Sequence, residues 1–464
     1  MLFQIILKEL QHNILSLRLH ISLVLILVVF SFGSMAYVKN HVDTKNEYTR
    51  YQNDFIENIR ENAGENFSDL AVSRKNIILQ PRDNSFISDA KEKYTPNQFE
   101  YSAYNVFGFS VKPGSINPYL NTFNELNWSF IISIVISFIV FLFTFDSISG
   151  EKESKTLSAT FANSISRGTV LLGKYLSTII TSILIVIPGM CISILIILIS
   201  RASAVTTFTL VEIVVFIVVA GIFIACIAAF GMLSSVITKS ARVSLLISLS
   251  FWLLFVAIVP NTALLWANMI FPIEKMEIVD ERVSMKLEDI ENNGLPGRWS
   301  SSGNPFLPQH ELRANNQTNR MNGEMQIRNA FYLDMFEQLE KVHYLTLLSP
   351  ISIFENLSEA VTGAGYLRFN KVWNDLHEYQ AQFLAFFKEK DAADDESPHW
   401  YNPREALSTT RKPVSFEELP LFTEKTISFG ERFTYASIFL LVMMIYTAVI
   451  FFAAFALFAR YDVR

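Results

Sequence analysis

Six long apolar stretches divide the chain. A helix needs about 20 mostly apolar residues to cross the core of a bilayer. Stretches of this kind lie at about 21–38, 128–145, 175–199, 208–237, 243–266 and 435–458. Three of the connections between them are short and polar, and two are long. The pattern predicts a polytopic membrane protein with six transmembrane helices.

The two long connections show helical rather than strand periodicity. In the first, apolar residues recur at three- and four-residue steps through 42–60 without Gly or Pro, so the first transmembrane helix could continue into it. In the second, helices are expected at about 324–343 and 366–390. No sustained period-two run is visible. We therefore expect an all-α fold with two mostly α-helical domains outside the membrane.

The distribution of Lys and Arg predicts the orientation. Six helices place both termini on one side of the membrane, and short cytoplasmic loops carry an excess of basic residues. The N-terminus, the 146–174 segment, the 238–242 turn and the C-terminus together carry ten basic and five acidic residues, whereas the short loop 200–207 has only Arg201. We expect the first group to be cytoplasmic. The long segments are both net negative, which weighs against nucleic-acid binding.

Few candidate functional residues lie within the spans. Glu212 is the one clearly ionisable side chain, and an intramembrane carboxylate is a functional hypothesis by default. Because it lies one turn from the membrane surface, we expect it to meet headgroups or water. Pro188 and Pro260 are expected to kink the third and fifth spans.

A face of small residues runs along the fourth span. Gly221, Ala225 and Ala229 lie four residues apart, a spacing that permits close approach of another helix. Packing within the subunit is the simpler interpretation, and a subunit interface is the alternative.

The chain offers no nucleotide or metal site of its own. Residues Gly168–Lys174 nearly match a phosphate-binding loop, but Tyr175 follows where Ser or Thr is required. The segment also leads directly into a membrane helix. The seven His residues form no metal-binding pattern, so no metal site is expected.

A short polar segment follows the second span. Its candidate functional residues are Asp146, Gly150, Glu151, Lys152, Glu153, Thr156 and Leu157, followed by Arg167 and Lys174. The mixed charge predicts a helical hairpin at the membrane surface that docks onto a soluble partner through ion pairs. A solvated connecting loop is the alternative.

This segment resembles the coupling region of ABC-2 type transporter permeases, in which an aspartate after the second span leads into Gly-Glu-Lys/Arg-Glu-x-Gly-Thr-Leu. Lys155 stands where the family usually has Gly. Lys8-Glu9-Leu10 is similar to the family's amphipathic N-terminal helix. The motifs Leu348-Ser349-Pro350 and Glu418–Phe422 resemble a branch with a large insert before the last helix, related to multicopper-enzyme maturation.

The resemblance implies the permease subunit of an ATP-driven exporter, not an enzyme, in the cytoplasmic (inner) membrane of a bacterium. Two copies of a separate ABC ATPase would bind ATP and Mg, and a second permease, identical or paralogous, would complete the complex. The implied organisation is a helix at 1–20, spans at 21–38, 128–145, 175–199, 208–237, 243–266 and 435–458, a coupling hairpin at 146–174, extracytoplasmic domains at 39–127 and 267–434, and a cytoplasmic tail at 459–464. A membrane-anchored sensor or scaffold, whose outer domains bind a ligand, is the alternative function.

Overall fold

The chain is built almost entirely from helices. The computed structural model describes residues 1–65, 70–71, 73–90, 96–110, 126–161, 165–293, 308–395 and 413–461. Six helices in these ranges are long and apolar enough to cross a membrane: Leu17–Gly64, Trp128–Glu153, Arg167–Ser200, Thr207–Ile237, Ala241–Ile258 and Phe429–Arg460. We number them spans 1 to 6. The predicted all-α fold with six membrane helices is confirmed.

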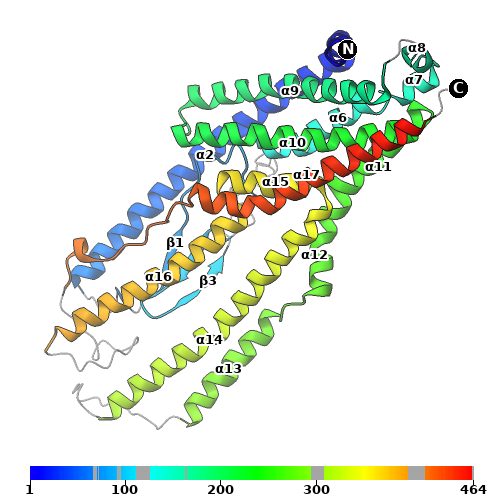
Figure 1. Ribbon diagram of the computed structural model, residues 1–464. Helices are drawn as coiled ribbons and strands as arrows, with labels where there is room; N and C mark the ends of the chain where they lie inside the picture. The colour runs from blue at the N-terminus through cyan, green and yellow to red at the C-terminus, as the bar shows by residue number, and fades with distance from the viewer. Residues whose placement is uncertain are drawn as a thin grey trace.

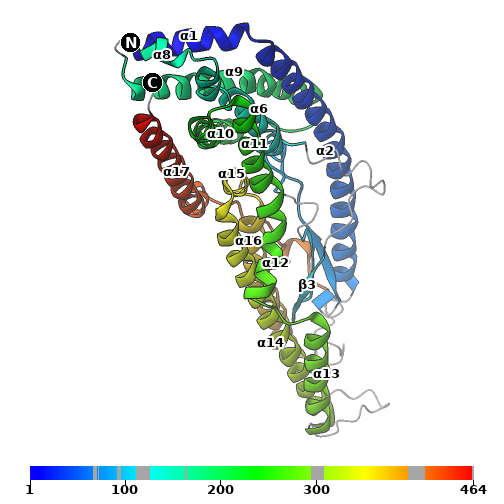
Figure 2. The same cartoon turned by 90° about the vertical axis from the view of Figure 1, so that its right-hand side faces the viewer.

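The spans lie side by side, and both ends of the described chain lie at one end of the bundle (Figure 1). We call this the terminal side and the opposite one the distal side. Helix α1 (Leu2–Leu15) crosses the terminal side (Figure 2). Span 4 is α10 (Thr207–Ile237), which packs against α9 (Arg167–Ser200) and α17 (Phe429–Arg460). Because α10 is apolar around its whole circumference, it forms the centre of the bundle.

Spans 2 and 5 each contain a π-helical segment. The apolar part of span 2 consists of α5 (Trp128–Phe130), η2 (Ile131–Ile136) and α6 (Ser137–Thr144). Span 5 consists of α11 (Ala241–Leu253) and η3 (Leu254–Ile258), and α12 (Val259–Ile270) continues from its end. Pro260 stands in the first turn of α12, directly after η3, where its missing N–H costs least. Pro188 lies inside α9, which continues past it to Ser200.

A seventh apolar helix enters the bundle without crossing it. Helix α15 (Pro350–Thr362) begins at Ser349, whose hydroxyl accepts the backbone N–H of Ser352, and ends at Gly363 in the left-handed conformation. At about 1.5 Å per residue it is roughly 20 Å long, too short to span a bilayer. Phe354 of α15 stacks on Phe223, near the middle of α10, with the ring centroids 4.5 Å apart. The helix therefore reaches into the interior of the bundle, where protein rather than lipid surrounds it.

Helix α2 (Leu17–Glu65) contains span 1 and then continues well beyond it on the distal side (Figure 1). Its 49 residues include no Pro, and its only glycines are Gly33 and Gly64. The prediction that the first membrane helix continues into the following segment is confirmed.

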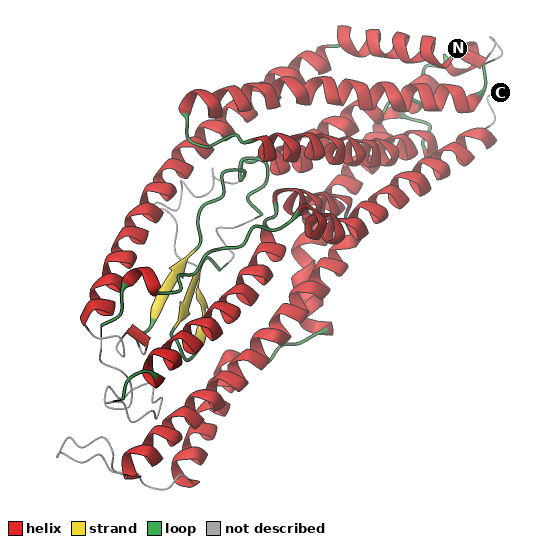
Figure 3. Cartoon of the chain, turned by 60° about the vertical axis from the view of Figure 1, so that its left-hand side comes forward, coloured by secondary structure: helices red, strands yellow, loops and turns green. Residues whose placement is uncertain are grey.

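The distal side holds a small sheet packed on helices. Strands β1 (Lys75–Ile78), β2 (Gln98–Tyr101) and β3 (Val106–Ser110) form an antiparallel sheet in the order β1-β2-β3 (Figure 3). One face packs on the aromatic stripe of α16 (Gly365–Ala392), where Phe109 lies 5.5 Å from Trp373 between ring centroids. This stripe was predicted at 366–390, but the sheet was not.

Two further long helices extend the distal part. Helices α13 (Met276–Asn293) and α14 (Pro308–Leu345) pack along one another and reach farthest from the termini (Figure 2). Ile59 of α2, Phe99 of β2, Phe336 of α14 and Phe383 of α16 lie in one hydrophobic core. The two long connections, which we predicted as separate domains, thus share a core. Of the predicted tail 459–464, residues 462–464 lie outside the described residues.

Candidate functional site

The polar segment after the apolar part of span 2 forms a compact hairpin on the terminal side. Helix α7 (Ser149–Glu153) leads into a turn, and α8 (Leu157–Phe161) follows. The backbone N–H of Thr156 donates to the carbonyl of Glu151 at 3.0 Å and closes the turn. Leu157 is buried in the core of the bundle and anchors the second arm. We call residues 146–161 the terminal hairpin.

Lys155 occupies the position in the turn where a glycine is favoured. Its φ of +57° lies in the left-handed region, which costs an L-residue with a side chain roughly 1 kcal/mol. The departure from the Gly usual in the family therefore does not change the turn, because Lys155 adopts the glycine-like conformation.

A buried lysine joins the terminal hairpin to two other helices. Lys174, in the third turn of α9, is 5% exposed, and its Nζ lies 2.9 Å from Glu9 Oε1 of α1 and 2.9 Å from Glu151 Oε1 of α7. Two carboxylates thus share one ammonium group. The segment 168–174 lies within α9, so the residues that resembled a phosphate-binding loop are helical.

The first residues of the hairpin are held by spans 1 and 4. Asp146 Oδ2 lies 2.7 Å from Arg18 in the first turn of α2. The hydroxyl of Ser235 in α10 accepts the backbone N–H groups of Ile148 and Ser149, each at 2.9 Å. These N–H groups have no partner within a helix at this point, so Ser235 caps the start of α7 from another element.

The charged residues of α7 also bond inward. Lys152 donates to the carbonyls of Val236 and Thr238 at the end of α10, the second at 3.0 Å. Glu153 Oε2 accepts the backbone N–H of Ala241, the first residue of α11, at 2.9 Å. The carbonyls at the end of α10 carry partial negative charge and bind the ammonium of Lys152. The N–H at the start of α11 carries partial positive charge and binds the carboxylate of Glu153.

Glu151 and Glu153, which we expected to face a soluble partner, are both bonded within the chain. Gly150 continues α7 and donates its N–H to the Asp146 carbonyl at 2.9 Å. The guanidinium of Arg167 lies over the ring of Phe161, 5.8 Å from its centroid, and donates to the carbonyl of Ala459 at the end of α17. Among the hairpin residues whose side chains the structure describes, the exposed ones are at its tip: Glu153, Ser154, Lys155, Thr156 and Ser158.

The geometry makes the hairpin a rigid extension of the membrane helices. Through the contacts above it is attached to α1, α2, α9, α10 and α11. Sequence reasoning singled out Lys174 and Glu151 but missed Arg18 and Ser235, because their partners are far away along the chain. Glu9 could have been recognised as a candidate from the sequence, because it is the one acidic residue among the first 20.

Glu212 lies in a second polar cluster, at the distal end of α10. Its side chain is 5% exposed, and Oε1 lies 2.6 Å from the Arg432 guanidinium in the first turn of α17. The amide of Asn84 donates to Oε2 at 2.9 Å. The expectation that Glu212 meets headgroups or water is wrong, because a buried arginine neutralises it.

The same cluster fixes the end of α15. Arg432 donates to the carbonyl of Val361 at 3.0 Å, and Asn84 donates to that of Thr362 at 3.0 Å. Gly363 follows with a φ of +64°, and a Cβ at this position would overlap the Arg432 guanidinium. We call Asn84, Glu212, Arg432 and the carbonyls of Val361 and Thr362 the distal clamp. It joins spans 4 and 6, α15 and the 82–90 segment.

The face of small residues on α10 divides into two environments. Ala229 is fully buried within the chain, and the carbonyl of Ala225 accepts the Tyr175 hydroxyl at 2.9 Å. A Cβ added to Gly221, by contrast, would meet no atom within 4 Å. A close helix approach lies instead at Gly231, where a Cβ would overlap Thr144 of α6. Packing within the subunit accounts for Ala225 and Ala229 but not for Gly221.

The sequence as a whole matches a known family. The model of the family described as ABC-2 family transporter protein matches residues 3–463, which is nearly the full length. No curated protein matches the chain.

Proposed function

The chain belongs to the ABC-2 transporter family, and on this premise we propose that it is the membrane-spanning permease subunit of an ATP-driven exporter. A separate ABC ATPase, in two copies, would bind ATP and Mg and dock on the terminal side. A second permease, identical or paralogous, would complete the complex. The chain itself would move an unidentified cargo and hold no nucleotide.

The attachment of the terminal hairpin supports this proposal most directly. Its tip is exposed, whereas its base is bonded to spans 1, 3 and 4 and to the start of span 5. A force applied to the tip would therefore move several spans together. A loop that only connects two helices would not need these charge contacts, because a loop at the surface can leave its polar groups in contact with water.

We also propose that the terminal side is cytoplasmic and the distal side extracytoplasmic, in the inner membrane of a bacterium. The basic bias of the short segments supports this orientation. The insert formed by α13 to α16 between spans 5 and 6 supports placement in the branch with large extracytoplasmic inserts.

The orientation is tested by cysteine labelling. In a background with Cys191 and Cys226 replaced, a membrane-impermeant maleimide added to intact cells should label Gln382→Cys on exposed α16 and leave Ser154→Cys unlabelled. Disruption of the membrane should make both sites reactive. Labelling of Ser154→Cys in intact cells would reverse the topology.

The coupling role is tested at the tip of the hairpin, because changes at Glu151 would also break internal contacts. Ser154→Trp adds a bulky side chain to the exposed tip, and Gln382→Trp adds the same side chain on the distal part as a matched control. We expect the first variant to remain folded but to retain less ATPase on purification, or to uncouple ATP hydrolysis from transport. The control should behave as the unmodified chain.

Two readouts decide the result: ATPase retained per permease, and ATPase rate in reconstituted membranes. If both are unchanged in Ser154→Trp, the hairpin is an ordinary loop and the sensor or scaffold function becomes the better explanation.

A further inference from the structure

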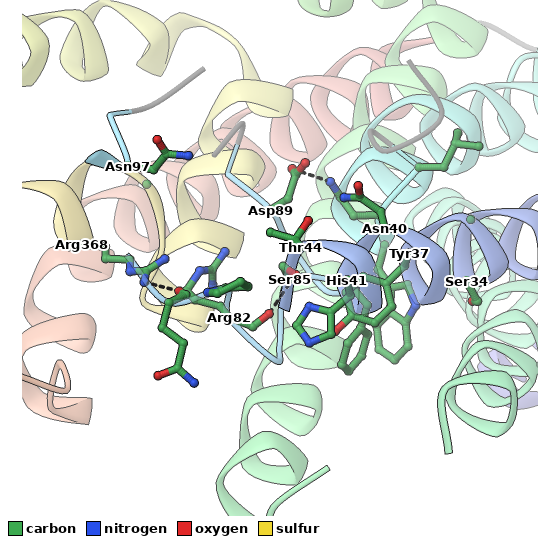
Figure 4. Close-up of a pocket in the computed structure, with 18 of the residues that line it drawn as sticks. Ser34, Tyr37, Asn40, His41, Thr44, Arg82, Ser85, Asp89, Asn97 and Arg368 are labelled. Carbon is green, nitrogen blue, oxygen red and sulfur yellow. Dashed lines mark hydrogen bonds between the residues drawn. The ribbon is translucent and has the colours of Figure 1, made fainter. Parts of the chain in front are cut away.

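A cavity of about 210 Å³ lies beside the distal half of span 1, away from the terminal hairpin. One wall is a single face of α2 that runs from Phe30 to Thr44, and the segment 79–89, the start of span 2 and the start of α16 form the others (Figure 4). In Figure 4, Ser34 lies toward one end of the cavity and Arg368 toward the other. Since a cavity of about 150 Å³ can hold a benzene molecule, this one has room for several methylene groups of a chain.

The inner end of the cavity is aromatic. The rings of Phe30 and Phe86 pack edge-on against Trp128, with centroids 6.2 and 5.1 Å away. Two serines also line this end, and their hydroxyl groups bond inward. The Ser34 and Ser193 oxygens lie 2.6 Å apart, and the indole N–H of Trp128 donates to Ser193 at 2.7 Å. Because these polar atoms bond to one another, the inner end offers a ligand mainly apolar surface.

The outer end of the cavity is lined by uncharged polar side chains. Asn40 and Thr44 continue the face of α2 beyond Val38, where the apolar run of span 1 ends, and Gln80 belongs to another wall. Thr44 and Gln80 are exposed, so this end opens toward the distal aqueous side. Amide and hydroxyl groups both donate and accept hydrogen bonds, which suits hydroxyl and ester groups on a ligand.

Two arginines in the lining are engaged by contacts within the chain. Arg82 donates to Asn84 Oδ1 at 2.8 Å and to the Ser88 carbonyl at 2.9 Å. Arg368 forms a two-point ion pair with Glu424, at 2.6 and 2.8 Å. Both guanidinium groups therefore already have partners that stabilise their charge.

A carboxylate and a histidine in the lining are engaged in the same way. Asp89 accepts the side-chain amide of Asn127 at 2.7 Å, and His41 Nε2 lies 2.9 Å from Asp83 Oδ1. A charged head in the cavity would have to displace one of these contacts or lose its hydration without a counter-charge, and either is costly. An uncharged head avoids both costs, so the lining favours a neutral ligand.

We propose that this cavity binds one neutral amphiphile, an aliphatic chain with an uncharged glycerol-ester head. The chain lies along Phe30 and Trp128, at the depth of the hydrocarbon, and the head bonds to Asn40, Thr44 and Gln80. A neutral lipid of the distal leaflet and a single-chain amphiphile from the distal aqueous phase share this chemistry. The site is separate from the terminal hairpin, and its occupancy does not depend on an ATPase.

The test uses bromine atoms on the chain as contact quenchers of Trp128. The purified full chain is placed in phosphatidylcholine nanodiscs, and its tryptophan fluorescence is titrated with a monoacylglycerol that carries a brominated stearoyl chain. We expect a saturating part of the quenching that Trp128→Phe lacks. The same brominated chain on a phosphocholine or phosphoglycerol head should need a roughly tenfold or more higher mole fraction for half-saturation.

Variants of α2 locate the binding site. Asn40→Phe fills the cavity between its two ends and should raise the half-saturating mole fraction of the monoacylglycerol roughly tenfold. Lys39→Phe, at the neighbouring exposed position, is the matched control and should leave it unchanged. If Asn40→Phe folds poorly, Thr44→Phe at the exposed outer end replaces it and should weaken binding in the same direction.

Three results would overturn the proposal: half-saturation by the charged heads at the same mole fraction, saturating quenching that persists in Trp128→Phe, or unchanged binding in the folded cavity variant. Because no ATPase is present, such a failure would leave the coupling proposal untouched.

A brominated diacylglycerol built into the nanodisc distinguishes the two sources of the ligand. If it quenches Trp128 as the monoacylglycerol does, the ligand is a lipid of the membrane. If only the monoacylglycerol quenches Trp128, the ligand enters from the aqueous side. Either result requires the same occupied cavity.

Discussion

The contact of Lys174 with Glu9 and Glu151 makes a prediction about non-additivity. Changing one carboxylate to Gln leaves the other at 2.9 Å from the buried ammonium, and the Gln oxygen still accepts a hydrogen bond. We expect Glu9→Gln or Glu151→Gln alone to destabilise the chain by about 1 kcal/mol, because the hydrogen bond is kept but the attraction between opposite charges is lost.

Changing both carboxylates has a larger effect than the sum of the two. The ammonium of Lys174, 5% exposed, would then have no counter-charge. Removal of the partner of a buried charge costs about 3–5 kcal/mol. The double variant should therefore exceed the sum of the single variants by about 1–3 kcal/mol, within the range measured for residues that share a network.

A third variant separates charge from packing. Adding Lys174→Met to the double variant removes the buried charge while keeping most of the side-chain volume. Such replacements of buried ion pairs are often neutral or stabilising. We expect the triple variant to recover at least about 2 kcal/mol relative to the double variant, if its apolar side chain packs in the same space.

The free energies follow from unfolding of the purified full chain in mixed micelles with increasing dodecyl sulfate, monitored by far-UV circular dichroism. Additive effects of the two glutamine changes would show that the carboxylates do not share the ammonium. A triple variant no more stable than the double would show that packing, not charge, controls the site.

Three further predictions use the same assay. Lys155→Gly should stabilise the chain by about 1 kcal/mol, because glycine adopts the left-handed φ without strain, whereas Lys155→Ala should not stabilise it. Equal stability of the two variants would show that Lys155 is not strained. Glu212→Gln should destabilise it by about 2–5 kcal/mol, because Arg432 stays buried without its counter-charge, and a loss below about 0.5 kcal/mol would indicate a solvated carboxylate. Burial lowers the pKa of Lys75 to about 7, while the unfolded chain keeps that proton to roughly pH 10.4. The unfolded state thus binds more protons between these values, so stability of the distal part should rise with pH by at most about 1.4 kcal/mol per unit, and Lys75→Met should lack this slope.

The sequence predicted the membrane part of the fold because a bilayer imposes a long, simple pattern. Twenty apolar residues with almost no charge are hard to mistake, and α9, α10 and α17 all show them. The stripe of α16 was predicted for a similar reason, since its aromatic residues recur along most of a 28-residue helix. Such signals are local and accumulate with length.

The features that were missed are short or depend on distant residues. The strands β1, β2 and β3 have four or five residues each, too few for a period of two to stand out. Helix α15 has 13 residues, and its burial arises from the two spans around it.

The error at Glu212 has the same origin. Its partner Arg432 lies 220 positions away, so the sequence showed a carboxylate near a membrane surface and no neutralising charge. Glu151 and Glu153 were correctly placed in a polar hairpin, but the direction of their side chains depends on α9 and α11.

The continuity of α2 has a mechanical consequence. A helix of 49 residues is about 74 Å long at 1.5 Å per residue, and long helices bend only gently. It begins beside the Arg18–Asp146 ion pair and ends in the core that contains the sheet. If it pivots near its midpoint, a tilt of about 5° displaces each end by roughly 3 Å, in opposite directions. A displacement of α2 at one membrane surface would therefore be transmitted to the other surface, because the helix has no flexible segment in between.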